Sequence, residues 1–196
     1  MILYFDTETT GLRPGQICQL TYIMQDKNGC TSKNMFFTVD FVEYGALSVH
    51  GLSVEKLKTL SDGKRFEDRI DEIERDFQSA DMIVSHNTSF DFMFMRHEFE
   101  KLGRVFTYKN GFCSMKSMTP VCKLPRANGL GYKYPKLSEL IGYFGITESA
   151  VISESQKIFG VLSGAHDARF DTVCVYLAMN TGFETEPVMA DIKGYI

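Results

Sequence analysis

The sequence predicts an α/β domain built on one mixed sheet, in which an antiparallel meander and parallel strands are flanked by helices. Three observations predict this class. Large apolar side chains open the chain at residues 2–5, two more strand patterns follow within the first 41 residues, and a helical pattern over 65–80 returns into a short buried strand at 82–84. A chain of 196 residues is long enough to bury one sizeable core.

The first three strands are expected to form the meander. Residues 2–5 are all large and apolar, which is typical of a strand buried on both faces. Residues 16–26 and 30–41 carry the second and third strand patterns, and the Lys27-Asn28-Gly29 segment between them is a hairpin signal. We therefore expect three antiparallel strands, with two carboxylates near one end of the first.

A helix and a crossover strand follow. Between residues 65 and 80 the apolar side chains fall at helical spacing, namely Phe66, Ile70, Ile73 and Phe77. The strand at 82–84 comes soon enough afterwards to be the return of a crossover. Ser89 is a good N-cap, so we expect a helix from there to about Leu102, with Asp91 in its first turn.

The next part of the chain is less regular. Residues 103–135 carry a short strand pattern near Phe112, a helical pattern over 116–122, and then a loop rich in proline and glycine. A helix over 137–144 is expected to end at Gly145 as its C-cap.

One strong helix closes the domain. Residues 152–162 are apolar, but their pattern does not distinguish a helix from a strand, whereas residues 172–180 predict an apolar helix. No linker, repeat or low-complexity tract divides the chain. We therefore expect one domain over 1–182 and a short C-terminal tail over 183–196.

Composition favours a folded protein of a reducing compartment. The apolar fraction is 44%, and no stretch of about 18 apolar residues occurs, so no membrane span is expected. The N-terminus shows neither a basic region nor a small-residue cleavage site. The five cysteines are widely spaced and form no C-x-x-C pair, which argues against a disulfide framework or a zinc site. We expect a cytoplasmic protein.

The net charge of −4 hides a strong asymmetry. Eight of the 21 basic residues lie between Lys101 and Ser138, where no acidic residue occurs. The rest of the chain holds 13 basic and 25 acidic residues. Five aromatic side chains are interleaved with these cations, namely Phe106, Tyr108, Phe112, Tyr132 and Tyr134. Cations meet phosphates and bases stack on aromatic rings, so the segment is either a nucleic-acid surface or a solvated basic face.

Two carboxylates end the first strand. Asp6 and Glu8 are two positions apart and, because strand side chains alternate between faces, they point the same way. Like charges held this close raise each other's pKa unless a cation lies between them, and oxygen ligands favour Mg²⁺ or Mn²⁺. A lone Asp-x-Glu pair is more often an ordinary solvated strand end, so the hypothesis depends on further ligands.

Further ligands are expected at two other places. Asp91 follows the short buried strand at 82–84, and His166 and Asp171 precede or begin the last helix. His166 and Asp171 can converge if Asp167 caps that helix, because His166 then lies in the preceding loop while Asp171 faces inward. Four carboxylates and one histidine predict a two-metal site that clamps the attacking and leaving oxygens of a displacement at phosphorus.

With these motifs, the sequence resembles the DEDDh 3′→5′ exonucleases of the ribonuclease-H-like superfamily, most closely their epsilon-like proofreading branch. Residues 4–12 resemble the first exonuclease motif, and residues 85–91 resemble the second. Residues 166–171 show the His-x₄-Asp spacing of the histidine-bearing branch, and residues 49–52 are similar to a loop of its epsilon-like members. The resemblance covers residues 1 to about 180 and implies a ribonuclease-H-like mixed sheet.

The resemblance also implies a role for each matching residue. Asp6 would bridge two Mg²⁺ (or Mn²⁺) ions, Glu8 and Asp171 would complete the tighter site, and Asp91 would hold the second ion. His166 would act as general base on the attacking water, because an imidazole can accept a proton near neutral pH.

Substrate contacts are expected on both sides of this site. In the family, positions matching Thr9, Thr10 and Leu12 touch the terminal nucleotide, and Asn87 is expected to line the same cleft. Three side chains of the basic segment are expected to contact the phosphate backbone, namely Lys123, Arg126 and Lys133. His86 ends a strand and is expected to orient the following loop rather than to bind metal.

These expectations describe a nuclease of DNA repair or replication that releases nucleoside 5′-monophosphates from single-stranded or frayed 3′ ends. A free-standing enzyme and one bound to a polymerase or another DNA-processing complex both fit. A short-RNA exoribonuclease of the same superfamily is the nearest alternative, although Thr7 and Thr10 around Glu8 favour the DNA-directed members. A catalytically silent binding module is the other alternative, which the intact set of five catalytic positions disfavours.

Overall fold

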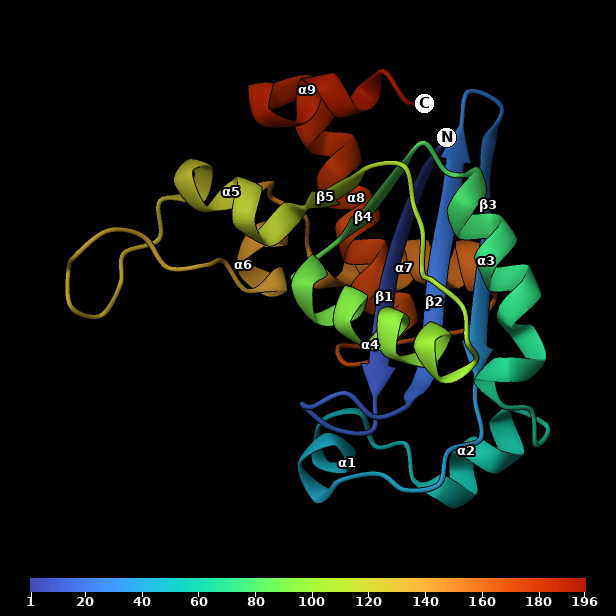
Figure 1. Cartoon of the computed structure of the whole chain (residues 1–196). Helices are drawn as coiled ribbons and strands as arrows, with labels where there is room; N and C mark the ends of the chain where they lie inside the picture. The colour runs from blue at the N-terminus through green and yellow to red at the C-terminus, as the bar shows by residue number, and fades with distance from the viewer.

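The computed structural model, which describes residues 1–196, is organised by one mixed sheet of five strands (Figure 1). These strands are β1 (Ile2–Thr9), β2 (Ile17–Asp26), β3 (Gly29–Phe36), β4 (Met82–Ser85) and β5 (Gly111–Cys113). Their order is β3-β2-β1-β4-β5; the first three pair antiparallel, while β4 pairs parallel with both β1 and β5. This arrangement confirms the predicted fold class.

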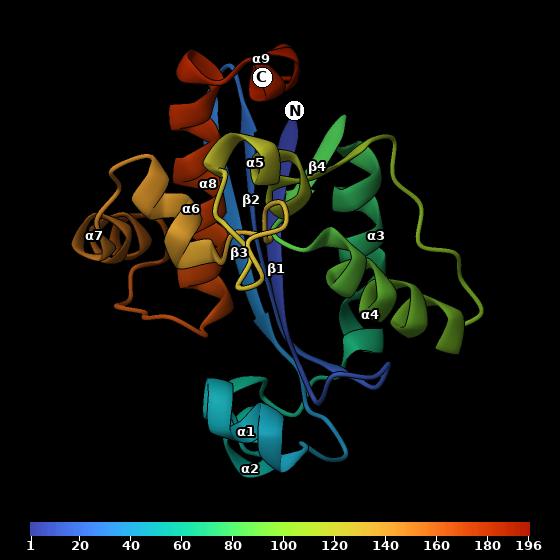
Figure 2. The ribbon, with the colours of Figure 1, turned by 90° about the vertical axis from the view of Figure 1, so that its left-hand side faces the viewer.

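Helices cover both faces of the sheet. They are α1 (Tyr44–His50), α2 (Val54–Leu60), a 3₁₀ helix (Phe66–Arg69), α3 (Ile70–Ser79), α4 (Thr88–Lys101), α5 (Ser114–Cys122), α6 (Leu137–Tyr143), α7 (Glu148–Phe159), α8 (Ala168–Thr185) and α9 (Pro187–Lys193). Figure 2 shows α3 and α4 on one side of the sheet and α6, α7 and α8 on the other, with α1 and α2 beyond the end of β1. None of the helices is both long and apolar enough to cross a membrane.

The side chains of β1 alternate between two hydrophobic cores. Ile2 and Tyr4 pack into the core that α8 covers, whereas Leu3 and Phe5 pack into the core that α3 and α4 cover. The alternation continues beyond the apolar run. It therefore turns the side chains of Asp6 and Glu8 toward α8, and the side chain between them, Thr7, toward α4.

The third strand is shorter than expected. It ends at Phe36 rather than Phe41: the Phe37 N–H still donates to the Cys18 carbonyl of β2 at 3.0 Å, and the next N–H, of Thr38, donates to the Lys64 carbonyl at 2.7 Å. Val39 then packs in a small separate cluster with Cys18, Leu52 and Leu57, the last of which belongs to α2. The chain after β3 therefore packs against α2 and the residues before it, rather than extending the sheet.

The helix that carries Asp91 begins earlier than expected and without the predicted cap. It starts at Thr88, and the preceding residue, Asn87, takes a left-handed conformation with φ of 72° and makes no side-chain capping bond. Ser89 is therefore inside the first turn, and its prediction as N-cap is wrong. Asp91 lies in the first turn as predicted.

The end of the chain differs from the expected tail. Helix α8 continues to Thr185, and α9 folds back so that Met189 and Ile192 are buried in the core beneath α8. Gly182 permits this contact, since a Cβ there would lie 2.1 Å from the Met189 sulfur. The apolar segment whose type the pattern left open is helix α7, capped by the Thr147 side chain.

Candidate active site

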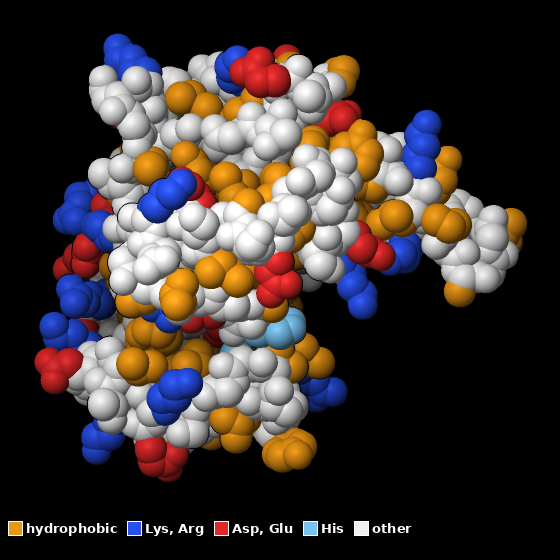
Figure 3. Space-filling model, turned by 180° about the vertical axis from the view of Figure 1, so that it is seen from behind, with side chains coloured by type: hydrophobic (Ala, Val, Ile, Leu, Met, Phe, Trp, Pro, Cys, Tyr) orange, Lys and Arg blue, Asp and Glu red, His pale blue; other side chains and the backbone are white.

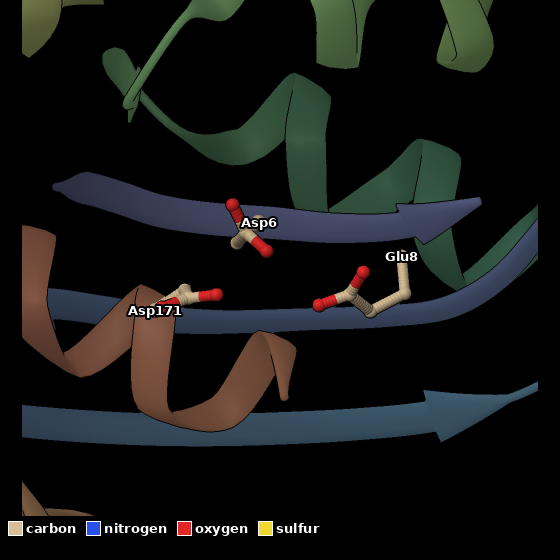
Figure 4. Close-up of side chains that lie close together, drawn as sticks. All are labelled: Asp6, Glu8 and Asp171. Carbon is tan, nitrogen blue, oxygen red and sulfur yellow. The ribbon is translucent and has the colours of Figure 1, made fainter. Parts of the chain in front are cut away.

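Three carboxylates meet where β1 ends beside α8. Asp6, Glu8 and Asp171 each offer an oxygen atom, and these oxygens all lie within 4.8 Å of one another (Figure 4). The first two project from β1 on the same face, and the third comes from the first turn of α8. The alternation of β1 and the start of α8 thus bring together side chains 165 positions apart in the sequence.

Asp91 lies next to this cluster, on the α4 side of β1. Its Oδ1 atom accepts a hydrogen bond of 2.8 Å from the Thr7 hydroxyl, and its side chain is buried. It is not one of the three groups within 4.8 Å, but its charge contributes to the raised pKa of Asp6. The four predicted carboxylates therefore occupy one region, as a close set of three with a fourth beside it.

The four carboxylates share an unfavourable environment. Burial is the main cause, and repulsion by the neighbouring carboxylates is the second. Together they raise the pKa of Asp6 well above its ordinary value and the pKa of Glu8 to about 9. Burial also raises the pKa of Asp91 and of Asp171 to about 7 each. None of the four makes a salt bridge with a lysine or arginine. An oxygen-only set of mutually repelling carboxylates fits Mg²⁺ or Mn²⁺.

His166 lies in the loop before α8, as the capping argument predicts. Asp167 is the N-cap, and its side chain accepts a hydrogen bond from the Arg169 N–H. His166 has a left-handed φ of 65°, and its backbone N–H donates to Oδ2 of Asp171 at 3.2 Å. His166 is exposed, and both it and Asp171 line the same cavity, of about 520 Å³. A substrate or water in that cavity therefore lies beside both residues.

Gln19 supports this loop, and the sequence analysis missed it. It is the β2 partner of Glu8 and is buried. Its Nε2 atom donates to Oδ1 of Asp167 at 3.0 Å and to Oδ1 of Asn34 at 2.8 Å, while its Oε1 atom accepts from the Ala168 N–H at 3.3 Å. A polar side chain in an otherwise apolar stretch of strand was the signal that could have identified it.

A second cavity, of about 320 Å³, opens beside Glu8. Its lining includes Thr9 and Leu12, and Leu12 is 82% exposed at its rim. His50 also lines it. Its Nδ1 atom accepts from the Leu52 N–H, so Nε2 carries the proton and donates to the Thr9 carbonyl at 3.2 Å. The histidine of the predicted 49–52 loop therefore fixes the backbone of the first motif.

Two predicted substrate residues do not line this second cavity. Thr10 is buried, and its hydroxyl oxygen accepts a hydrogen bond from the Gln16 N–H at 3.0 Å, so it holds the loop after β1 in place. Asn87 forms the left-handed residue between β4 and α4. Their assignment as substrate contacts stays a prediction.

His86 contacts a distant loop rather than the one that follows it. Its Nε2 atom lies 3.0 Å from the Pro135 carbonyl oxygen, and its Nδ1 atom lies 3.0 Å from the Ser114 hydroxyl. A carbonyl only accepts, so Nε2 is the donor. Burial lowers the pKa of His86 to about 4, which keeps the ring neutral. His86 thus joins the end of β4 to the loop before α6.

The basic segment divides into two parts. Four of its eight cations form salt bridges: Lys101 with Glu98, Arg104 with Asp71 and Glu74, Lys109 with Asp81, and Lys133 with Glu139. The other four, Lys116, Lys123, Arg126 and Lys136, make none. Of the interleaved aromatics, Phe106 is buried and Tyr108 packs against the same core, whereas Tyr132 and Tyr134 are exposed. The charge of Lys133 is therefore already matched by a carboxylate.

Solved exonuclease structures share this fold. A structure of Exonuclease X in complex with 5′ overhanging duplex DNA matches with a TM-score of 0.61 at 20% identity, covering 99% of this chain and 100% of that chain. E. coli Exonuclease I in complex with a 5cy-dT13 oligonucleotide matches with a TM-score of 0.72 at 17% identity, covering 97% of this chain and 42% of that one. The chain therefore has the fold of these solved exonuclease structures.

Two curated relatives are named DNA polymerase III subunit epsilon, from Rickettsia felis and Rickettsia conorii. Each is 32% identical over 108 residues, which cover 52% of this chain and 45% of the relative. The match thus spans about half the length of these relatives. No family model matches the sequence. The two relatives and the shared fold confirm the resemblance to the epsilon-like exonucleases.

Proposed function

We propose that this protein is a metal-dependent 3′→5′ exonuclease that hydrolyses the terminal phosphodiester of DNA. One observation carries the proposal: Asp6, Glu8 and Asp171 converge without any balancing cation, Asp91 lies beside them, and His166 lines the cavity next to Asp171. The likeness to exonuclease folds and to the epsilon relatives supports the same activity.

The four carboxylates would hold two Mg²⁺ or Mn²⁺ ions. Bound there, the ions would stabilise the charge that develops on the attacking and leaving oxygens at phosphorus. The carboxylates contribute a fixed set of oxygen ligands from one strand end and two helix starts, so little rearrangement is needed on loading. Loading would also reverse their raised pKa values, because a cation favours the ionised form.

His166 would be the general base. Its ring takes the proton of the attacking water at a nitrogen, while the backbone bond from His166 to Asp171 fixes the loop that presents the ring. Such a base contributes roughly 10²–10⁴ in rate. Attack at the terminal phosphorus breaks its bond to the 3′ oxygen of the preceding nucleotide, which releases a nucleoside 5′-monophosphate.

The cavity beside Glu8 would receive the terminal nucleotide. Thr9, Leu12 and His50 line it, and the Phe90 side chain provides an apolar wall. Thr10 would shape this pocket from behind, and Asn87 would border the cleft between the pocket and the cluster. Lys123, Arg126 and Lys133 would contribute to the positive surface that meets the phosphates.

The preferred substrate would be a single-stranded or frayed 3′ end, in DNA replication or repair. The relatives carry the name of a polymerase subunit, which supports a polymerase or another DNA-processing complex as the setting, in the cytoplasm. All five cysteines are free, in keeping with a reducing compartment.

Labelled oligonucleotides test the proposal. Single-stranded DNA with a 5′ label should shorten one nucleotide at a time in Mg²⁺, and the same strand with a 3′ label should release labelled mononucleotide first. RNA of the same sequence should be cut more slowly. Loss of label from the 5′ end first, or degradation that proceeds in excess EDTA, would show that the proposal is wrong.

A further inference from the structure

A hairpin projects from the body of the molecule between α5 and α6. Residues 123–136, called the arm below, extend well beyond the sheet and its helices (Figure 1). The arm is ordered by its own backbone, since Pro125 and Tyr132 form a bridge, the Arg126 N–H donates to the Gly131 carbonyl at 3.2 Å, and the Lys133 N–H donates to the Leu124 carbonyl at 2.8 Å. It is a preformed element that contributes little to the core.

The chemistry of the arm suits nucleic acid. It contains no acidic residue, and three of its four cations, Lys123, Arg126 and Lys136, make no salt bridge. Tyr132 is 43% exposed and Tyr134 is 57% exposed. Figure 3 shows cationic and apolar side chains together along this projection. Unpaired cations bind phosphates and exposed aromatic rings stack on bases, whereas an acidic protein partner would leave the rings unused.

The base of the arm lies at the candidate active site. Lys136, its last residue, lines the same cavity as His166 and Asp171. The His86 bond to the Pro135 carbonyl ties the arm to the end of β4, just before the helix that carries Asp91. The arm therefore starts beside the carboxylates and runs away from them, so a strand that ends at the carboxylates can continue along it.

We propose that the arm binds the single strand on the 5′ side of the terminal nucleotides and so gives the protein a preference for long strands over short ones. This inference rests on the proposed function, which sets the 3′ end at the carboxylate cluster. Phosphates of the upstream nucleotides meet Lys123 and Arg126, and their bases stack on Tyr132 and Tyr134. Strands of only two or three nucleotides do not reach these side chains.

Binding in EDTA tests the arm without cleavage. Fluorescence anisotropy would measure the affinity for oligothymidylates of 3 to 20 nucleotides across a salt series. The charge variant is Lys123→Gln/Arg126→Gln, in which glutamine keeps an N–H donor for the Tyr132 carbonyl. The matched control is Lys27→Gln/Lys58→Gln, which removes two exposed cations that make no salt bridge and lie outside the arm.

The charge variant should bind long strands about tenfold more weakly at low salt, with the slope of log affinity against log salt reduced by about 1.4, because each single-strand phosphate contact contributes about 0.7. The control should match the wild-type protein. Tyr132→Ala/Tyr134→Ala should weaken binding by at least about fivefold at every salt concentration with an unchanged slope, because stacking is not ionic.

The proposal is wrong if the arm variants bind long strands as tightly as the control does. It is also wrong if the wild-type protein binds strands of 3 and 20 nucleotides with equal affinity, or binds neither at low salt. These outcomes are separate from failure of the proposed function, which the wild-type protein would show by releasing no mononucleotide in Mg²⁺. If the wild-type protein releases mononucleotides in Mg²⁺ while the arm variants bind long strands as tightly as the control, the proposed function holds and this inference is wrong.

Discussion

Gln19 on β2 donates a hydrogen bond of 3.0 Å to Asp167, the residue that caps α8. The same glutamine stands beside Glu8 in the β1–β2 ladder and accepts a bond from the first N–H of α8. One buried side chain thus sets the distance between the strand that carries two of the carboxylates and the helix that carries the third. The position of His166, one residue before the cap, depends on the same contact.

Replacing Gln19 should therefore damage turnover as well as stability. Gln19→Leu removes both bonds to the start of α8, so we expect kcat to fall by roughly 10–100-fold, because small displacements of catalytic groups are costly. The free energy of unfolding should fall by about 1–3 kcal/mol. Gln25→Leu is the matched control, because Gln25 bonds to Asn180 farther along α8. Equal losses of kcat in the two variants would contradict a positioning role for Gln19.

The metal-free protein should lose stability as the pH rises from 7 to 9. Glu8, with a pKa raised to about 9, and Asp6, whose pKa is also raised, retain protons in the folded state that the unfolded chain has lost. The folded state binds more protons, so its stability falls with rising pH, by about 2 kcal/mol or more over this range. Urea unfolding in EDTA at pH 7, 8 and 9 measures it.

The control for this experiment is Asp6→Asn/Glu8→Gln. Burial also raises the pKa of the Cys18 and Cys174 thiols, which changes stability in the same direction, so the informative quantity is the difference between wild-type and variant slopes. His86, with its pKa lowered to about 4, is neutral in both states over this range. A wild-type slope no steeper than that of the variant would contradict the repulsion described here.

Divalent cations should relieve this repulsion. We expect EDTA to abolish cleavage, Mg²⁺ or Mn²⁺ to restore it, and either ion to raise the melting temperature at pH 8. Ca²⁺ should raise the melting temperature without supporting comparable turnover. The Asp6→Asn/Glu8→Gln variant should show no such thermal shift. Full activity in excess chelator, or an equal shift in that variant, would rule out the carboxylates as the metal site.

Local rules were sufficient for much of this site. Alternation along β1 predicts that Asp6 and Glu8 share a face, and the capping preference of Asp167 predicts the loop position of His166. Both rules act within one element, so they apply before the tertiary structure is known. The resemblance of the motifs to those of a known family then implied that the carboxylates on these separate elements belong to one site.

The features that the sequence analysis missed depend on contacts between distant segments. The role of Gln19 requires the register of β1 against β2, which places it beside Glu8. The docking of α9 requires that Met189 meet the surface left free by Gly182, a residue that sequence alone suggests as a helix end. Asn87 adopts the left-handed conformation before α4, which displaced the expected cap at Ser89.

The last prediction separates the general base from the metal ligands. Asp171→Asn removes a charged ligand, so metal affinity and turnover should both collapse. Removing the His166 ring should leave metal affinity unchanged, because in the proposed mechanism that ring meets only the attacking water, and kcat should fall by about 10²–10⁴ with little change in substrate Kd. Mn²⁺ titration followed by thermal shift, together with single-turnover cleavage, measures both quantities in each variant.

The choice of substitution at His166 matters, because its backbone is left-handed with φ of 65°. Alanine, like the native histidine, carries the strain of about 1–2 kcal/mol that a Cβ causes in this conformation, and without the ring the loop can relax, whereas glycine adopts this conformation freely. If the ring is the base, His166→Gly and His166→Ala should lose kcat equally, since both lack the proton acceptor. If the loss occurs only in the alanine variant, the loop backbone and not the imidazole is responsible. If either variant loses Mn²⁺ as Asp171→Asn does, His166 is a ligand and its assignment as base is wrong.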